Sequence, residues 1–410
     1  MNEQEYGCSV EGDANVYGPL AVAVPGFLGG VGAMWERWGR LQWEDIVGPA
    51  RRLLDHGLRY ESARDAIEFK REVIARYPST AALLLPGGRI PAAEDPWPRP
   101  DLARTFDRLA AAGWRDFYDG EIGRAIADFV ASQGGILTRA DMAGFVPRIT
   151  EPCSATYRGA ILHTAIAPNG GYSVLAALSG LEPKPIVPDN TAEYWITMAK
   201  LLEQMWTKRL ADAPLSDAGA VPRGGPSPGT VHVAAADAEG NLVSATISQG
   251  GLFGSCLAVP DTGIILGHGM CRFDPHPGLA NSPGPGKRPL NNVCPLIIRL
   301  PDRDVAIGAR GGRRIVSVAV QMTQRIVDFA ADVYQAAIAP RIHTLTGDPL
   351  EISANFDPAM RGALAAAGYR IEVPAEVAGA AHGAEIVLLP SRQRGTNAIR
   401  AGGNTWAAGL

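Results

Sequence analysis

Hydrophobic positions in the first half of the chain recur mainly at helical spacing. Apolar residues three and four positions apart, with polar residues between them, are typical of helices that bury one face. The stretches with this period are 35–57, 101–114, 120–135 and 190–212. Gly57 has the position of a helix C-cap, Thr138 and Asp141 have capping-box spacing, and 156–166 (TYRGAILHTAI) predicts a strand.

The pattern changes after residue 212. Residues 213–229 are rich in Pro, Gly, Ser and Ala and have no apolar period, which predicts a loop or linker. Short β-rich runs with tight turns follow, and one further helix is predicted over 314–338. The predicted strands are 230–237 and 242–248, joined by a turn at 238–241, and then 262–267, 294–300, 304–312, 384–390 and 396–403. Helices and strands in this order predict an α+β protein with layers stacked around sheets in one domain.

Composition and charge narrow the partners. The 410 residues are 46% hydrophobic, enough for a large core, and the formal net charge of −4 comes without a basic arm or stripe. We therefore expect a small-molecule or peptide ligand, and neither nucleic acid nor a membrane. The first 25 residues lack a basic start before an apolar run, and no apolar run reaches 18 residues, which predicts a cytoplasmic protein.

The five cysteines indicate neither a metal site nor a disulfide framework. No C-x-x-C pair occurs, and no His lies at ligand spacing from them. An odd number of cysteines fits a reducing compartment. We expect no metal and no cofactor.

Thr230 directly follows Gly229 and opens a predicted strand. A β-branched residue at a strand start is ordinary, so propensity alone can explain it. The second interpretation is a self-cleaving junction, in which the Thr230 hydroxyl attacks the Gly229 carbonyl. Cleavage would leave Thr230 as a new N-terminus whose α-amine, with a pKa of about 7.7–8.0, can serve as general base for its own hydroxyl.

Gly311 and Gly312 lie between a predicted strand and the helix at 314–338, within GARGGRRI. Successive backbone NH groups at such a turn can hold an anion, including the oxyanion of an acyl-transfer reaction. Gly pairs in strand-to-helix turns also occur for purely structural reasons, so this motif does not decide the function.

The chain resembles the γ-glutamyltranspeptidases, N-terminal-nucleophile hydrolases that cleave their own precursor before a Thr. The resemblance runs in order through nearly the whole chain. The matching segments are 21–57, 117–145, 156–172, 229–255, 287–295, 308–315 and the closing NTWAAGL at 404–410.

This resemblance implies a four-layer αββα sandwich and a specific catalytic set. Thr230 matches the nucleophile within a T-x-H pattern, Ser248 matches the hydroxyl that hydrogen-bonds the nucleophile, and Gly311 with Gly312 match the oxyanion hole. The family's self-cleavage implies a large fragment, 1–229, and a small fragment, 230–410, that stay together as a heterodimer.

The chain departs from the family where the substrate is gripped. Gly250 replaces an Asn, and the N-N-x-M-D-D-F segment reads GHGMCRF at 267–273, with Arg272 in place of the amine-binding acid. The family's Ser-Ser pair is Asn291-Asn292, and a family Arg that binds the substrate carboxylate has no counterpart before Val24. A cation in place of an anion repels an ammonium and attracts a carboxylate.

We therefore expect Arg272, Asn291, Asn292 and His268 to bind a carboxylate-bearing substrate. For Arg272 the alternative is an ordinary exposed Arg, and for His268 a structural His.

Thr230 would attack a carbonyl of this substrate in acyl or amide hydrolysis. The alternatives are a C–C bond hydrolase in the biosynthesis of an alkylproline-containing antibiotic or a related metabolite, a true γ-glutamyl transferase or glutathione hydrolase, and a non-catalytic binding protein of the same fold.

Overall fold

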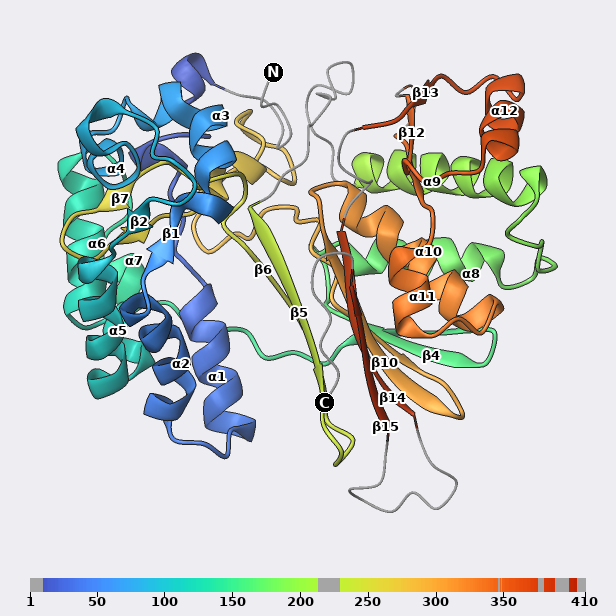
Figure 1. Ribbon diagram of the computed structural model, residues 1–410, viewed down its shortest axis with the longest axis horizontal. Coiled ribbons are helices and arrows are strands. Elements are labelled where there is room, and N and C mark those ends of the chain that lie inside the picture. The colour runs from blue at the N-terminus through green and yellow to red at the C-terminus, as the bar shows by residue number, and fades with distance from the viewer. Residues whose placement is uncertain are drawn as a thin grey trace. The chain divides into compact units, whose positions relative to one another are not determined.

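A computed structural model of the protein describes residues 10–212, 229–345, 347, 349–374, 380–387 and 398–403 (Figure 1). These residues form two compact units, where one domain was expected. The helical unit comprises Ser9–Ile149 and Gln249–Cys271, and the sheet unit comprises Thr150–Ser248 and Arg272–Leu410. Residues 213–228 of the predicted linker and the closing segment 404–410 lie outside the described residues.

The helical unit has its own hydrophobic core. Its elements are α1 (Phe27–Trp38), α2 (Trp43–Asp55), β1 (Leu58–Arg59), α3 (Arg64–Ile74), α4 (Pro78–Leu84), β2 (Pro96–Trp97), α5 (Pro100–Ala112), α6 (Glu121–Ser132), α7 (Arg139–Ala143), β7 (Ala258–Val259) and β8 (Ile264–Ile265). Trp43, Trp114, Ile126 and Met142 are buried in this core. The helical pattern over 35–57 is interrupted, because the backbone turns extended at Gly39 and α2 begins at Trp43.

The sheet unit is built around one antiparallel sheet of six strands in the order β15-β14-β10-β9-β4-β3. Its strands are β3 (Cys153–Tyr157), β4 (Ala160–Thr164), β9 (Leu296–Arg299), β10 (Arg303–Arg310), β14 (Ala380–Val387) and β15 (Ala398–Gly403). The other elements are the hairpin β5 (Thr230–Ala236) and β6 (Leu242–Ser248), the helices α8 (Gly171–Leu181), α9 (Ala192–Asp212), α10 (Arg314–Asp328), α11 (Val333–Ile338) and α12 (Pro358–Ala366), and a small sheet of β11 (Ile342–His343), β12 (Leu350–Ile352) and β13 (Ile371–Glu372).

The hairpin and the helices cover opposite faces of this sheet. A Cβ at Gly308 would lie 2.2 Å from the His232 ring, so this face of β10 packs against β5. A Cβ at Gly383, which is paired with Ile307, would lie 2.3 Å from Val333 of α11. Neighbouring residues of a strand point to opposite faces, so the hairpin, the sheet and the helices α8, α10 and α11 form successive layers (Figure 1).

Two predicted elements are each divided in the structure. The strand predicted over 156–166 is part of the hairpin β3–β4, because Arg158 and Gly159 both have positive φ, as a two-residue hairpin turn requires. The helix predicted over 314–338 is two helices, because Asp332 forms a capping box with Gln335 that starts α11. The hairpin β5–β6 and the long helix α9 confirm their predictions.

Candidate active site

Thr230 and Ser248 face each other at the open end of the β5–β6 hairpin. They are directly paired across the two strands, and their Oγ atoms lie 2.9 Å apart in a hydrogen bond. The Ser248 hydroxyl also lies 3.4 Å from the carbonyl oxygen of Gly229, to which it can donate. Thr230 is only 2% exposed. One serine hydroxyl thus contacts both the predicted nucleophile and the carbonyl of the peptide bond before it.

The hairpin lies along β10 in a way that directs Thr230 toward the end of that strand. Ser244, the cross-strand partner of Ala234, donates to the Ile307 carbonyl at 2.9 Å, while His232 packs on Gly308. The contact on β10 therefore shifts from Ile307 to Gly308 as the position on β5 goes from Ala234 back to His232. Thr230, the next residue of β5 on the same face, points toward the residues that follow Gly308.

Gly311 and Gly312 occupy the turn between β10 and α10, as the sequence predicted. Their φ angles are 124° and 60°, in the region that favours glycine, and both residues are buried. Within the described ranges, neither backbone NH donates a hydrogen bond. The start of α10 is fixed by Arg314, which forms two hydrogen bonds with the Glu351 carboxylate of β12. The turn therefore offers two NH donors beside the positive end of a 15-residue helix.

Asn291 and Asn292 lie in the segment that leads into β9. The Asn291 NH donates to the Pro168 carbonyl at 3.1 Å, and the Gly170 NH donates to the Val293 carbonyl at 2.9 Å. The sequence did not predict their third neighbour, Arg209 at the end of α9, which donates to the Asn291 carbonyl at 2.7 Å. The sequence does contain a signal for the burial of Arg209, because this residue continues, at helical spacing, the buried face of α9 that contains Leu202 and Met205.

His268 is a buried residue of the helical unit, whereas Thr230 belongs to the sheet unit. Its Nε2 accepts the Gly251 NH at 2.5 Å, so its Nδ1 carries the proton and donates to the Val16 carbonyl at 3.0 Å. This ring also explains Gly250, which has φ of 97°, because a Cβ there would lie 1.9 Å from His268 Cδ2. The structure gives His268 a backbone-holding position.

Arg272 ends the 3-10 helix Gly269–Arg272 and is half-buried. Its carbonyl accepts a hydrogen bond from the Asn281 side-chain amide at 2.8 Å.

The Cys294 thiol is fully buried in the core of the sheet unit. Cys153, Cys256, Cys271 and Cys294 are not joined to one another by disulfides, and Cys8 lies outside the described residues. Complete burial raises the pKa of the Cys294 thiol to about 12, so it stays protonated at neutral pH. Across the described ranges, no group of three or more His, Cys, Asp or Glu residues could hold a metal ion. Among the helices of these ranges, none has the length and apolar character needed to cross a membrane.

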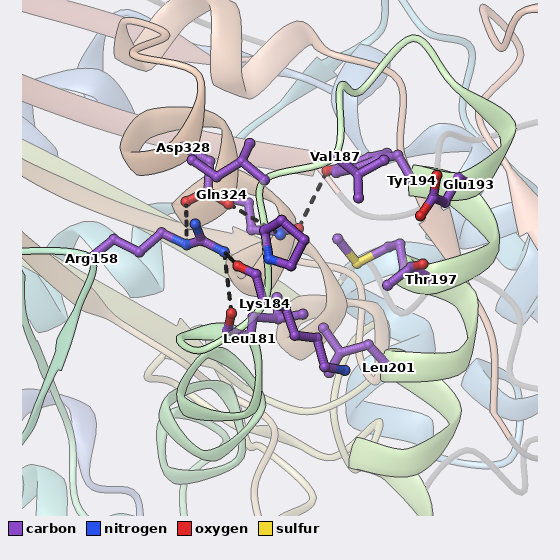
Figure 2. Close-up of a pocket in the computed structure, with 13 residues that line it drawn as sticks. Arg158, Leu181, Lys184, Val187, Glu193, Tyr194, Thr197, Leu201, Gln324 and Asp328 are labelled. Carbon is purple, nitrogen blue, oxygen red and sulfur yellow. Dashed lines mark hydrogen bonds and ion pairs between the residues drawn. The ribbon is translucent and has the colours of Figure 1, made fainter.

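Figure 2 shows a pocket of about 160 Å³ that the predicted site residues do not line. Its polar wall is a buried network in which Arg158 Nε lies 3.3 Å from Asp328 Oδ1 and the Tyr157 hydroxyl donates to Asp328 Oδ2 at 2.8 Å. Arg158 also donates to the carbonyls of Leu181 and Lys184. Asp328 ends α10, roughly 20 Å along the helix from the Gly311–Gly312 turn. The network joins the β3–β4 turn to the ends of α8 and α10.

Comparisons with known proteins agree with this fold. The γ-glutamyltranspeptidase family model matches residues 1–220 and 192–403. The acylase ACY 1 proenzyme of Pseudomonas sp. (strain SE83) is 32% identical over 399 residues, which cover 89% of this chain and 71% of the relative. The glutathione hydrolase proenzyme of Pseudomonas aeruginosa is 27% identical over 374 residues, which cover 80% of this chain and 67% of the relative.

A solved structure, the cephalosporin acylase from Bacillus halodurans, superimposes with a TM-score of 0.82. It covers 96% of this chain and 79% of its own, at 24% sequence identity. The predicted α+β fold of the N-terminal-nucleophile hydrolase type is confirmed by this match and by the layers of the sheet unit.

Proposed function

The chain belongs to the γ-glutamyltranspeptidase family of N-terminal-nucleophile hydrolases, and from that premise we propose that it is a self-processing acylase. It cleaves itself between Gly229 and Thr230 and then uses Thr230 to hydrolyse the amide bond of an acyl donor that ends in a carboxylate. Its family and relatives are hydrolases and acylases; the cleavage position, the nucleophile and the substrate are the proposal.

One observation carries the proposal. The Thr230 hydroxyl and the Gly229 carbonyl, which would react with each other, both lie within hydrogen-bond distance of the Ser248 hydroxyl. Strand propensity would explain a Thr at position 230, but it would not require that its buried hydroxyl bond a serine that also reaches the preceding carbonyl.

The processing step follows from these contacts. Thr230 Oγ attacks the Gly229 carbonyl carbon, the C–N bond breaks, and the released α-amine takes the proton as an ester forms. Water then hydrolyses the ester, which leaves a carboxylate on Gly229 and a free hydroxyl and amine on Thr230. Ser248 orients the attacking hydroxyl and donates to the carbonyl oxygen as it becomes negative.

Turnover repeats this chemistry on an external acyl donor. The Thr230 α-amine removes the hydroxyl proton, because its pKa is near neutrality, and the hydroxyl attacks the substrate carbonyl. The NH groups of Gly311 and Gly312, which make no hydrogen bond within the described ranges, stabilise the oxyanion. The amide C–N bond then breaks, and the amine leaves with the proton held by the Thr230 α-amine. Water hydrolyses the remaining ester, which releases the acid and restores Thr230.

We assign the grip on the substrate carboxylate to Asn291 and Asn292, together with Arg272. Arg272 is a cation where the family resemblance implies an acid. The side-chain amides of Asn291 and Asn292 add neutral donors, which favour an anion over an ammonium. The names of the relatives support an acylase, since the acylase proenzyme is more similar to this chain than the glutathione hydrolase proenzyme is. His268 is left out of this set, because its ring nitrogens hold backbone groups.

The two proposed fragments have to remain associated, and the sheet explains why they would. Strands β3 and β4 come from fragment 1–229, while β9, β10, β14 and β15 come from fragment 230–410, and all six form one sheet. Separating the fragments would break the β4–β9 ladder and expose the core on both faces. We therefore expect a heterodimer of the two fragments.

The first experiment follows the purified protein on a denaturing gel and by mass spectrometry. We expect two fragments that end at Gly229 and begin at Thr230, and one intact band for Thr230→Ala. Acyl donors with a terminal carboxylate are then compared with γ-glutamyl donors, and the acyl group is sought on Thr230 in a trapped intermediate. An active wild-type protein that stays intact across residues 229–230 would disprove the mechanism.

A further inference from the structure

Arg209 is a buried cation that contacts residues 291–293, the segment that contains the two asparagines assigned to the substrate and is called the substrate segment below. It lies in the last turn of α9 and is 5% exposed. Its Nη2 donates to the Asn291 carbonyl at 2.7 Å and to Asn292 Oδ1 at 3.2 Å, while its Nη1 donates to Ser173 Oγ at 3.2 Å. Within the described residues, its hydrogen-bond partners are all neutral.

No carboxylate compensates this charge within the described part of the chain. Arg209 takes part in none of the ion pairs found there, and its buried Nε has no hydrogen-bond partner there. Burial lowers the pKa of the guanidinium to about 10, so Arg209 remains charged at neutral pH. A buried cation paired only with neutral acceptors gives its surroundings a positive potential.

The hydrogen bonds of the two asparagines determine which end of each amide remains available. Asn291 Oδ1 accepts the Val293 NH at 3.1 Å, and Asn292 Oδ1 accepts Arg209. Both oxygens are therefore occupied inside the protein, whereas within the described ranges neither Nδ2 donates a hydrogen bond. Both residues are half-exposed, so a ligand can reach these amides. An NH₂ group only donates, and it therefore matches an acceptor such as a carboxylate.

The segment is also held rigidly by its backbone. The loop before α8 clamps it through the Pro168 carbonyl and the Gly170 NH, and a Cβ at Gly170 would lie 2.7 Å from the Asn292 carbonyl oxygen. Arg209 supplies the remaining contact on the side of α9. Removing it would release the Asn292 amide, which could then rotate by 180° and present its oxygen to the ligand.

We propose that Arg209 is a positioning residue that sets the specificity of the site for an acyl group ending in a carboxylate. It fixes the Asn292 amide so that NH₂ donors face the substrate, and it adds a positive charge behind them. The inference rests on the proposed function, because Asn291 and Asn292 are assigned there to the substrate.

The test compares matched acyl donors. Succinyl, glutaryl and adipoyl p-nitroanilides end in a carboxylate, and the corresponding half-amides have the same shape without the charge. Arg209→Met is expected to lower the ratio of kcat/KM for the acid over that for the amide by roughly ten- to a hundredfold, mainly through KM. Arg209→Lys, which keeps the charge but not the fork, should recover part of the ratio.

Arg341→Met is the matched control. Arg341 is a buried Arg of the sheet unit whose pKa burial also lowers to about 10, and it donates to the carbonyls of Ala337 and Ala339. Its removal should affect stability and leave the acid-to-amide ratio at the wild-type value. If Arg209→Met fails to fold, Asn292→Asp provides the second variant, because its carboxylate can still pair with Arg209 but should repel the acid substrates.

The outcomes separate the two proposals. A wild-type protein that is not cleaved before Thr230 and hydrolyses no anilide contradicts the proposed function. Calorimetry with succinate, glutarate and adipate then still tests Arg209, since the wild type should bind one of them at least tenfold more tightly than Arg209→Met does. Turnover or binding that is equally selective in the wild type and Arg209→Met, or absent selectivity in the wild type, overturns the inference alone.

Discussion

Replacing Ser248 by Ala tests the geometry of the cleavage site most directly. The substitution removes the hydroxyl that lies 2.9 Å from Thr230 Oγ and 3.4 Å from the Gly229 oxygen, and it leaves the buried Thr230 hydroxyl without that partner. A lost hydrogen bond of this kind costs about 1–2 kcal/mol, with most of the effect from the shorter contact. If the bond orients the attack, self-cleavage should slow by roughly five- to thirtyfold.

The assay is the time course of precursor disappearance on a denaturing gel, started from freshly synthesised chain. Ser244→Ala is the control, because Ser244 lies on the same strand and face and its hydroxyl bonds the Ile307 carbonyl and the Leu296 NH. It should lower stability by a similar amount and keep the wild-type rate of cleavage. Equal rates for wild type and Ser248→Ala, or equal slowing by both substitutions, would refute the role assigned to Ser248.

Two further predictions concern the helical unit. Gly250→Ala should lower the free energy of unfolding by about 2–4 kcal/mol, because the new Cβ would overlap His268 and the residue has a φ of 97°. Gly30→Ala in α1 is the control and should be neutral or stabilising, because the space around its Cβ is open. Urea denaturation of both variants measures the difference. Burial lowers the pKa of Lys70 from 10.5 to about 8. Between these pH values the unfolded state binds more protons than the folded state, so the free energy of unfolding should rise from pH 8 toward 10.5. Lys70→Met should remove this contribution to the rise, and equal slopes against pH for the two proteins would contradict it.

The sequence predicts the elements that have a clear local cause. The hairpin β5–β6 follows from alternating residues and the turn around Gly240, which has φ of 94°, and α9 follows from its apolar period. The predicted pairing of Thr230 with Ser248 is present because the hairpin register is fixed by that turn. Periodicity could not show the break before α11, since the apolar spacing continues across Asp332 and only its cap divides the helix.

The contacts of the substrate segment could not be predicted in the same way. Arg209 and Asn292 are 83 positions apart in sequence, and no local pattern indicates that the end of α9 meets the segment before β9. The sequence shows Gly250 as a departure from the family pattern, but the cause of this glycine is the His268 ring, which occupies the space that a side chain would need. Both features depend on tertiary packing, which leaves no period in the sequence.

The position of the proposed cut within the fold bears on how the new N-terminus would work. Thr230 is the first paired residue of β5, and the ladder continues from Thr230–Ser248 to Ala236–Leu242. Cleavage before Thr230 therefore removes no residue pair between β5 and β6, and β5 stays packed against β10 through His232 and Gly308. The released amine would gain freedom only on the Gly229 side, while the hydroxyl kept its place beside Ser248. The same contacts that orient the precursor for cleavage would thus hold the mature nucleophile, so a substitution that displaces Ser248 should impair processing and turnover together.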